Sequence, residues 1–322
     1  MALGMLVEGE WTTHGIPKDS DGRFVRAETS FRDWVTADGS SGYKTEPDRY
    51  HLYLASACPW AHRAALLRRL KGLEEAISIS IVDPFMGNNG WMFSDAPGTI
   101  PDTLNSASYL REVYQKADPD YTGRVTTPVL WDKETETIVN NESREIIRML
   151  DTEFEDLATN DVDYGPDDLR EEIDRTIDEI YEPINNGVYK SGFATTQAAY
   201  EEAVITLFDA LDHWEEVLGG RRYLCGDRIT EADWCMFPTL VRFDPVYHYH
   251  FKCNIRRISD YPNLWGYLKD LYQQPGVAET VNFDHIKQHY YMSHESVNPT
   301  RIVPIGPEMN LNEPHGREHI SG

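Results

Sequence analysis

The sequence predicts a two-domain protein, in which a mixed α/β domain with the element order βαβ–ββα precedes an all-helical domain. Strand-like and helix-like segments alternate through about 100 residues before residue 160. From about Asp167 onward, apolar residues recur at helical spacing and strand signals are scarce. A chain of 322 residues can bury two separate cores. We divide it into an N-terminal extension (1–45), an α/β domain (46–160), a helical domain (161–292) and a C-terminal tail (293–322).

The N-terminal extension is punctuated by Gly, Asp, Ser and Thr up to about Lys44, which predicts irregular structure. Isolated aromatic residues such as Trp11 and Phe24 indicate that the extension packs onto the body of the protein. The tail is rich in Pro and Gly after about Ser293, and we expect it to follow the surface.

The α/β domain opens with a strand, a helix and a second strand. Tyr50–Leu54 is a short apolar segment that predicts a strand, and residues 59–71 predict a helix with Leu66, Leu67 and Leu70 facing inward. Ile77–Ile81 alternates with period two, which predicts another strand. An insertion rich in Gly, Asn and Pro follows at residues 83–120.

The second half of this domain predicts two strands and a helix. Residues 124–132 are strand-like but contain Pro128, which cannot donate to a ladder and so belongs at a strand start, an edge or a turn. Thr137–Asn140 completes a hairpin with this segment. A helix then begins near Glu142 and Ser143, and its apolar residues at helical spacing are Ile146, Ile147, Leu150 and Phe154.

The helical domain carries two apolar stripes, which we interpret as core. The first stripe is Ile173, Ile177, Ile180 and Ile184, and the second is Val204, Phe208, Leu211, Trp214 and Leu218. Gly219 and Gly220 end the second helix, and a capping box formed by Thr230 and Asp233 starts the next one.

The net charge of −24 disfavours one class of binding partner and favours one kind of habitat. Nucleic acid is disfavoured, because phosphate binding needs a basic stripe and none is visible. The acidic residues are dispersed over otherwise amphipathic segments, as on a solvated face adapted to salt that screens self-repulsion. This composition favours a halophilic source, with an acidic mesophile as the alternative.

Hydropathy and cysteine usage predict a cytoplasmic protein. No run of about 18 apolar residues is present, so no membrane span is expected. The N-terminus lacks a basic segment and meets acidic residues too early for a secretory signal. The four cysteines, Cys58, Cys225, Cys235 and Cys253, show no CxxC pair and no disulfide spacing, which is typical of a reducing compartment.

Cys58 is the candidate nucleophile. It lies between the first strand and Pro59, and proline suits the first helical position because its missing N–H would be unpaired there. At a helix N-terminus, unpaired N–H groups and the helix dipole favour negative charge, so a thiol there loses its proton more easily. The alternative is a buried structural cysteine.

Several motifs together resemble one family. They are Cys58-Pro59-Trp60-Ala61, Gly90-Trp91-Met92-Phe93-Ser94-Asp95, Thr127-Pro128-Val129-Leu130-Trp131-Asp132, Asn140-Asn141-Glu142-Ser143 and His285-Ile286-Lys287-Gln288-His289-Tyr290-Tyr291. With the domain order, this set resembles the glutathionyl-hydroquinone reductases, the xi class of glutathione transferases. The resemblance implies a thioredoxin-like N-terminal domain, an all-α C-terminal domain and a glutathione-transferase fold, usually as a homodimer.

The resemblance also implies a glutathione site. Pro128 resembles the family's cis-proline, which leaves a backbone edge free to pair with a thiol peptide. Glu142 and Ser143 match the pair that holds the γ-glutamyl end, with simple helix capping as the structural alternative. The remaining implied glutathione contacts are Trp91, Arg124, Val125, Thr126 and Thr127.

The implied reaction uses Cys58 alone, because a single thiol needs a second thiol from solution to resolve its mixed disulfide. Cys58 attacks the sulfur of a glutathionyl-hydroquinone, the hydroquinone leaves, and a second glutathione releases oxidised glutathione. The departing aromatic carbon calls for a general acid. By resemblance, Tyr189 is that proton donor, and Tyr247 and Tyr290 line the acceptor site and favour the thiolate. Tyr249 and Tyr291 are neighbours in sequence that could be mistaken for them.

Other interpretations remain open. The same cysteine could serve an omega-like thiol transferase or dehydroascorbate reductase, or the fold could be a non-catalytic binding protein. A halophilic source raises γ-glutamylcysteine as the cosubstrate in place of glutathione. His248, His250 and Cys253 could bind zinc, but a fourth ligand is missing and we expect no metal.

Overall fold

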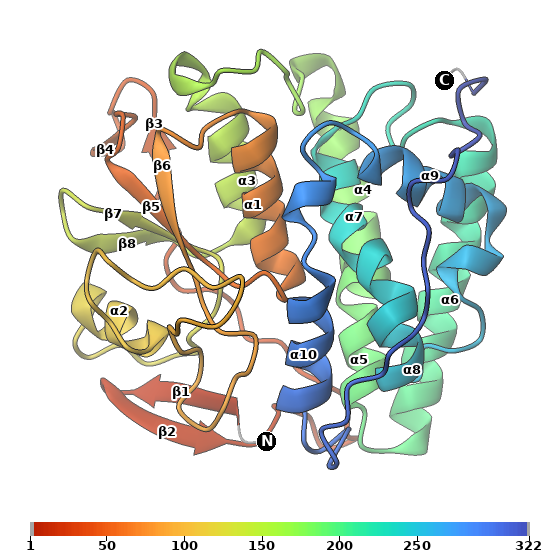
Figure 1. The fold of residues 1–322 in the computed structure, drawn as a ribbon, viewed down its shortest axis with the longest axis horizontal. Helices are drawn as coiled ribbons and strands as arrows, with labels where there is room; N and C mark the ends of the chain where they lie inside the picture. The colour runs from red at the N-terminus through yellow and green to blue at the C-terminus, as the bar shows by residue number, and fades with distance from the viewer. Residues whose placement is uncertain (1–2, 321–322) are drawn as a thin grey trace.

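The sheet of the α/β domain and the helical domain lie side by side, with α1 (Pro59–Leu70) and α3 (Ser143–Thr152) between them (Figure 1). The computed structural model describes residues 3–320. Four strands pair in the order β6-β5-β7-β8. β5 (Tyr50–Leu54) is parallel to β6 (Ile77–Ile81) and antiparallel to β7 (Val129–Asp132), which pairs antiparallel with β8 (Thr137–Asn140).

Both faces of this sheet are covered, which explains why every residue of β5 is buried. One face packs against α1 (Pro59–Leu70) and α3 (Ser143–Thr152), through side chains that include Leu52, Leu130 and Val139. The other face, with Tyr53 and Trp131, packs against α2 (Leu110–Ala117). The alternation of side chains between two cores is the period-two pattern of a strand.

The helical domain consists mainly of α4 (Arg170–Ile180), α5 (Gly187–Phe193), α6 (Gln197–Gly220), α7 (Glu231–Arg242), α9 (Pro262–Tyr272) and α10 (Phe283–Ser293). π-helical segments at Tyr181–Asn185 and Phe243–Tyr247 continue α4 and α7, and the short α8 (His248–His250) follows the second. Both predicted apolar stripes are buried, and α6 ends at Gly220 as expected. The predicted capping box of Thr230 and Asp233 is also confirmed.

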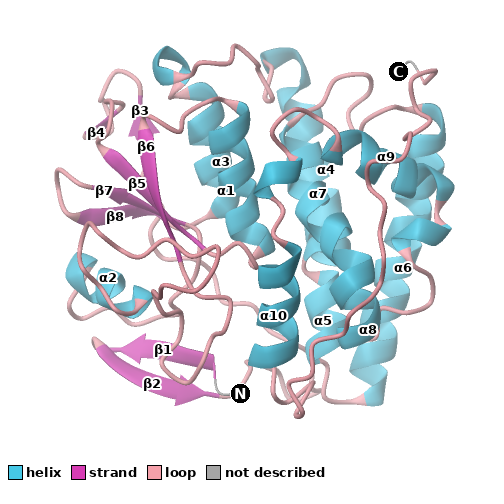
Figure 2. Cartoon of the chain, viewed as in Figure 1, coloured by secondary structure: helices cyan, strands magenta, loops and turns pink. Residues whose placement is uncertain are grey.

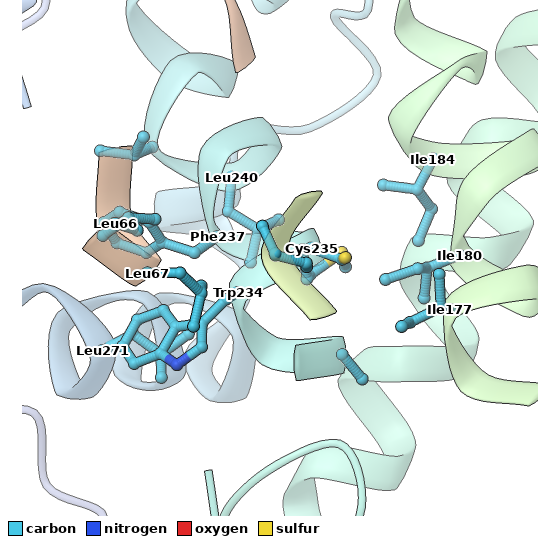
Figure 3. Packing of buried hydrophobic residues seen from close by; sticks show 14 of the residues in the cluster. Leu66, Leu67, Ile177, Ile180, Ile184, Trp234, Cys235, Phe237, Leu240 and Leu271 are labelled. Carbon is cyan, nitrogen blue, oxygen red and sulfur yellow. The ribbon is translucent and has the colours of Figure 1, made fainter. Parts of the chain in front are cut away.

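α7 joins the two domains through a continuous apolar core. Figure 3 shows Leu66 and Leu67 of α1 beside Phe237 and Leu240 of α7. Ile177 and Ile180 of α4, and Ile184 of the π-helical segment that follows it, lie on the other side of α7. The central packing of α7 explains why every residue from Glu231 to Arg242 is buried. No helix between residues 3 and 320 is long and apolar enough to cross a membrane.

Three predictions about local structure were wrong. The extension is not wholly irregular, because β1 (Leu3–Val7) and β2 (Glu10–His14) form a hairpin, and β3 (Val35–Thr36) pairs with β4 (Tyr43–Lys44). The strand expected at 124–132 begins only at Val129, after the proline. The helix expected to include Phe154 ends at Thr152.

The insertion also contains a helix, α2, that the sequence did not indicate. Its buried residues are Leu110, Val113 and Tyr114, too short a stripe to stand out among the Gly, Asn and Pro around it. The tail after α10 is a loop that runs beside the helical domain (Figure 2). Its carbonyl groups at Leu311 and Pro314 accept hydrogen bonds from α9 and the residue that follows it.

Buried neutral histidines make stability depend on pH. Burial lowers the pKa of His51 and His289 to about 4 and that of His250 to about 3. The unfolded chain, with histidine pKa values of about 6.5, therefore binds protons that the folded chain rejects as the pH falls from about 6.5 to 4. Burial also raises the pKa of Asp151, to about 6, and the pKa of Asp233, and these two groups oppose the trend.

We expect the free energy of unfolding to fall between about pH 6.5 and 4, by about 1.4 kcal/mol per pH unit for each such histidine. Denaturant titrations in molar salt, which screens the net charge, measure this. The slope of the unfolding free energy against pH gives the number of protons that the chain takes up on unfolding. His51→Gln should lower this number by about one. A stability that is flat or rises in acid would contradict the prediction.

Candidate active site

Cys58 is the N-cap residue of α1, with φ −77° and ψ 124°, and Pro59 occupies the first helical position as expected. The Cys58 N–H donates to the Ala55 carbonyl over 2.9 Å. The thiol is partly exposed, and its Sγ lies 3.6 Å from the Thr127 carbonyl oxygen, to which the S–H donates. The structure therefore presents the only partly exposed thiol of residues 3–320 at a helix N-terminus, since the other three cysteines are buried.

Arg242, fully buried on α7, holds the loop that carries Cys58. Its guanidinium donates to the carbonyl groups of Ser56 (2.9 Å) and Ala57 (3.0 Å) and to Nδ1 of His62 (2.9 Å). Burial lowers the pKa of His62 far below its usual value, so the imidazole is neutral and can accept this bond. The helical domain thus fixes the position of the nucleophile.

The protonation of His62 follows from its second contact. His62 Nε2 lies 2.8 Å from Oγ1 of Thr280, and that hydroxyl donates to the Val277 carbonyl over 2.7 Å. The hydroxyl can therefore only accept from Nε2–H, which leaves Nδ1 as the acceptor for Arg242. The polar side-chain atoms of Arg242, His62 and Thr280 therefore all have partners.

A cleft of about 210 Å³ opens beside Cys58 and collects most of the predicted site. Its lining includes Cys58, Trp91, Tyr189 and the four residues Arg124, Val125, Thr126 and Thr127. Trp91 is held by stacking on His289 of α10, with ring centroids 4.7 Å apart and planes 22° apart. The insertion and the helical domain together therefore form one wall of the cleft.

The segment before β7 forms another wall, and the peptide bond between Thr127 and Pro128 is cis. Tyr114 fixes the segment by donating from its hydroxyl to the Thr126 carbonyl over 2.9 Å. The Thr127 hydroxyl is buried and has no hydrogen-bond partner within residues 3–320. A buried hydroxyl without a partner costs free energy unless a ligand satisfies it.

Arg124 lines the cleft and has no carboxylate partner in the described chain. It donates to the carbonyl groups of Gly4 (3.3 Å) and Gly15 (3.5 Å), and burial lowers its pKa. A partly buried guanidinium held only by carbonyl groups is suited to receive an anion.

Glu142 and Ser143 do not line this cleft. Glu142 caps α3 by accepting from the Arg144 N–H over 3.2 Å, and it lines a neighbouring pocket. The Ser143 hydroxyl is buried, donates to Glu142 (3.4 Å) and accepts from Arg63 (3.3 Å). The structure thus shows the capping function of Glu142, and binding of a γ-glutamyl group by this pair remains a prediction.

The three predicted tyrosines form one hydrogen-bonded chain. The hydroxyls of Tyr189 and Tyr290 are 2.5 Å apart, and those of Tyr290 and Tyr247 are 3.0 Å apart. Only Tyr189 faces the cleft, because Tyr247 and Tyr290 are 0% and 1% exposed. Burial, followed by the nearby charge of Cys58, raises the pKa of Tyr189, so its phenol keeps its proton at neutral pH.

The neighbouring tyrosines lie elsewhere. Tyr249 is 72% exposed, and the Tyr291 hydroxyl donates to the Pro245 carbonyl over 3.0 Å. His250 contacts His294 over 3.2 Å, and no three His, Cys, Asp or Glu side chains in residues 3–320 are grouped to hold a metal.

Sequence reasoning missed the part of the cleft that the N-terminal extension builds. Phe24, Arg26 and Thr29 all line the cleft, together with Trp60 and His294. Trp60 could have been found, since it follows the cysteine by two positions. Arg26 lies in a segment without periodicity, so nothing local indicated its place.

Comparison with known proteins identifies the family. Family models described as "Glutathione S-transferase, N-terminal domain" and "Glutathione S-transferase, C-terminal domain" match residues 57–153 and 197–270. The chain is 53% identical to glutathionyl-hydroquinone reductase YqjG of Escherichia coli over 98% of this chain and 99% of that protein. It is 55% identical to glutathionyl-hydroquinone reductase PcpF of Sphingobium chlorophenolicum, over 96% of this chain and 98% of that one.

Solved structures agree. A xi-class glutathione transferase from Natrialba magadii superimposes with a TM-score of 0.95 at 54% identity, covering 100% of this chain and 98% of that one. The glutathione-bound structure of Escherichia coli YqjG matches with a TM-score of 0.88 at 55% identity, over 90% and 96% of the two chains. The chain belongs to the glutathione S-transferase family, among its xi-class members and the glutathionyl-hydroquinone reductases.

Proposed function

We propose that this protein reduces glutathionyl-hydroquinones to hydroquinones at the expense of glutathione. The observation that carries the proposal is the cleft that holds a partly exposed thiol and a protonated tyrosine together, Cys58 on one domain and Tyr189 on the other. A thiol nucleophile with an acid beside it is what cleavage of an aryl thioether requires.

In the first step, the Cys58 thiolate attacks the glutathione sulfur of the substrate and forms a disulfide. The bond between that sulfur and the aromatic carbon breaks, and its electron pair goes to the carbon. Tyr189 protonates this carbon, and the buried Tyr290 hydroxyl, 2.5 Å away, stabilises the phenolate left on Tyr189. The hydroquinone then leaves, and Cys58 remains joined to glutathione.

In the second step, a second glutathione thiol loses its proton, which restores the phenol of Tyr189, and its thiolate attacks the mixed disulfide at the glutathione sulfur. Oxidised glutathione departs, and the Cys58 thiolate is restored. No ring carbon is protonated here, so the tyrosine acid is needed only in the first step. The two electrons that reduce the substrate come from the two glutathione sulfurs.

The thiol peptide would pair with the backbone near Val125, with Trp91 and the free Thr127 hydroxyl beside it and its anionic end toward Arg124. Glu142 and Ser143 would bind the γ-glutamyl end after exchanging some of their present hydrogen bonds for ligand contacts. γ-Glutamylcysteine would keep these last contacts and lose those of the glycine residue. We also propose that the protein acts in the cytoplasm as a homodimer.

The first prediction concerns the nucleophile. Cys58→Ala should abolish turnover of glutathionyl-menadiol, because no other thiol of the described chain reaches the cleft. Cys225→Ala, which removes a buried thiol, is the matched control and should retain turnover. Equal rates for the wild type and Cys58→Ala would overturn the mechanism. A wild type that releases glutathione from proteins but leaves glutathionyl-menadiol intact would favour the omega-like thiol transferase.

The second prediction separates the two steps. Tyr189→Phe should lower kcat for glutathionyl-menadiol by about 100-fold or more, the usual contribution of a general acid. The same variant should still reduce the mixed disulfide of glutathione and mercaptoethanol, whose leaving group needs no such acid.

Because the pKa of Tyr189 is raised, the acid-dependent rate should not decline up to about pH 9. Tyr249→Phe, on an exposed tyrosine, controls for the loss of a hydroxyl. Equal losses on both substrates in Tyr189→Phe would refute the assignment.

The third prediction uses the unpartnered hydroxyl. Thr127→Val removes a group without an internal partner, so thermal stability should stay the same or rise. If the hydroxyl contacts glutathione, Kd measured by calorimetry should rise about fivefold, equivalent to about 1 kcal/mol. An unchanged Kd would remove Thr127 from the binding site.

A further inference from the structure

We propose that Arg26 binds an anionic substituent, a carboxylate, on the hydroquinone ring. The inference rests on the proposed function and adds a substrate class to it. Arg26 lines the same cleft as Cys58 but has no part in the chemistry described so far.

The segment that carries Arg26 is fixed against the helical domain. The Thr195 N–H donates to the Gly22 carbonyl over 3.1 Å, and the Thr196 hydroxyl donates to the Asp21 carbonyl over 2.8 Å. Gly22 has φ +84°, and a Cβ there would lie 2.6 Å from the Thr195 hydroxyl, so only glycine allows this approach. The position of Arg26 is therefore set by the fold.

Three aromatic rings surround the guanidinium of Arg26. Its central carbon lies 5.0 Å from the ring centroids of both Trp60 and Tyr189 and 5.4 Å from that of Phe24. Its Nε donates to Oδ1 of Asn186 over 2.8 Å, which orients the planar group. Rings on several sides also make this the part of the cleft suited to an aromatic substrate.

The remaining donors of Arg26 are free. An arginine has five N–H donors, and within residues 3–320 only the Nε donor of Arg26 has a hydrogen-bond partner. Arg26 forms no ion pair within residues 3–320, although Glu28 lines the same cleft. The nearby Arg23 and Arg32, in contrast, form ion pairs with Glu202 and Glu145. In a chain with a net charge of −24, a half-buried arginine without a carboxylate indicates that a ligand supplies one.

The position of Arg26 favours contact with the hydroquinone ring of the substrate over contact with its γ-glutamyl group. The Ser143 hydroxyl accepts a hydrogen bond from Arg63 and not from Arg26. The guanidinium carbon of Arg63 lies 4.5 Å from the centroid of the Trp60 ring. Arg26 instead contacts the ring of Tyr189, the proposed acid. An anion bound to Arg26 would therefore belong to the hydroquinone ring, which Tyr189 protonates. A carboxylate also matches the two outer nitrogens of the guanidinium in a bidentate pair.

The test compares the glutathione conjugates of gentisate, a carboxylated hydroquinone, and of methyl gentisate, in which a neutral methyl ester replaces the carboxylate. For the wild type, kcat/KM should be higher for the carboxylate than for the ester. In Arg26→Gln the ratio of the two should fall about tenfold to a hundredfold, the value of one charge-assisted contact. Arg26→Lys, which keeps the positive charge but not the planar pair of N–H donors, should restore part of the ratio.

Arg23→Gln, an exposed arginine of the same segment, should leave the ratio unchanged. Arg26 also lowers the pKa of Tyr189, so both substrates can lose rate in Arg26→Gln, and only the ratio isolates anion binding. A ratio that does not change in Arg26→Gln would overturn the inference and leave Arg26 as a residue that acts on Tyr189.

Calorimetry on Cys58→Ser protein separates this inference from the proposed function. Without turnover, the carboxylate conjugate should bind more tightly than the ester, and the added Arg26→Gln substitution should remove the difference. A wild type that turns over neither of these conjugates nor glutathionyl-menadiol would refute the function. Equal binding of both conjugates would refute the role of Arg26 whatever the turnover shows.

Discussion

The buried contact between Arg242 and the loop before Cys58 is the constraint on which the site depends. A positive charge with 0% exposure and no carboxylate partner in the described chain would be costly alone. Three carbonyl groups and a neutral histidine accept its hydrogen bonds, and two of those carbonyls belong to the residues just before the nucleophile. Moving the loop before Cys58 would break these hydrogen bonds and leave the buried charge of Arg242 without two of its partners. The position of Cys58 is therefore coupled to α7.

The same junction explains why the cleft needs both domains. The sheet and α1 present the thiol, whereas α5 and α10 present Tyr189, Tyr290 and the histidine that holds Trp91. Tyr247 and Tyr290 have almost no access to water, and burial raises the pKa values of all three tyrosines and keeps protons on them. One site therefore holds the candidate nucleophile, Cys58, beside a phenol that keeps its proton.

Much of the fold and of the candidate site could be predicted from the sequence, because residues close together in the chain determine these features. Cys58 and Pro59 are adjacent, so the strand end, the cap and the helix start could all be inferred from one short segment. The four strands of the main sheet and the two apolar stripes follow from periodicity, and both were found in the structure. Glu142 shows the limit of this reasoning, because capping and ligand binding require the same residue at the same helix start. The hairpin of β1 and β2, α2 and the position of Arg26 depend on contacts between segments far apart in the chain. Arg26 and Asn186, for example, are joined by a hydrogen bond across 160 positions.

The mixed disulfide is the central claim, and intact-protein mass spectrometry under single turnover tests it most directly. The protein is mixed with one equivalent of glutathionyl-menadiol in the absence of free glutathione. The account predicts one added glutathione on Cys58, one equivalent of released menadiol, and loss of the adduct when glutathione is supplied. A protein that carries the naphthalene ring, or that releases menadiol without retaining glutathione, would contradict it.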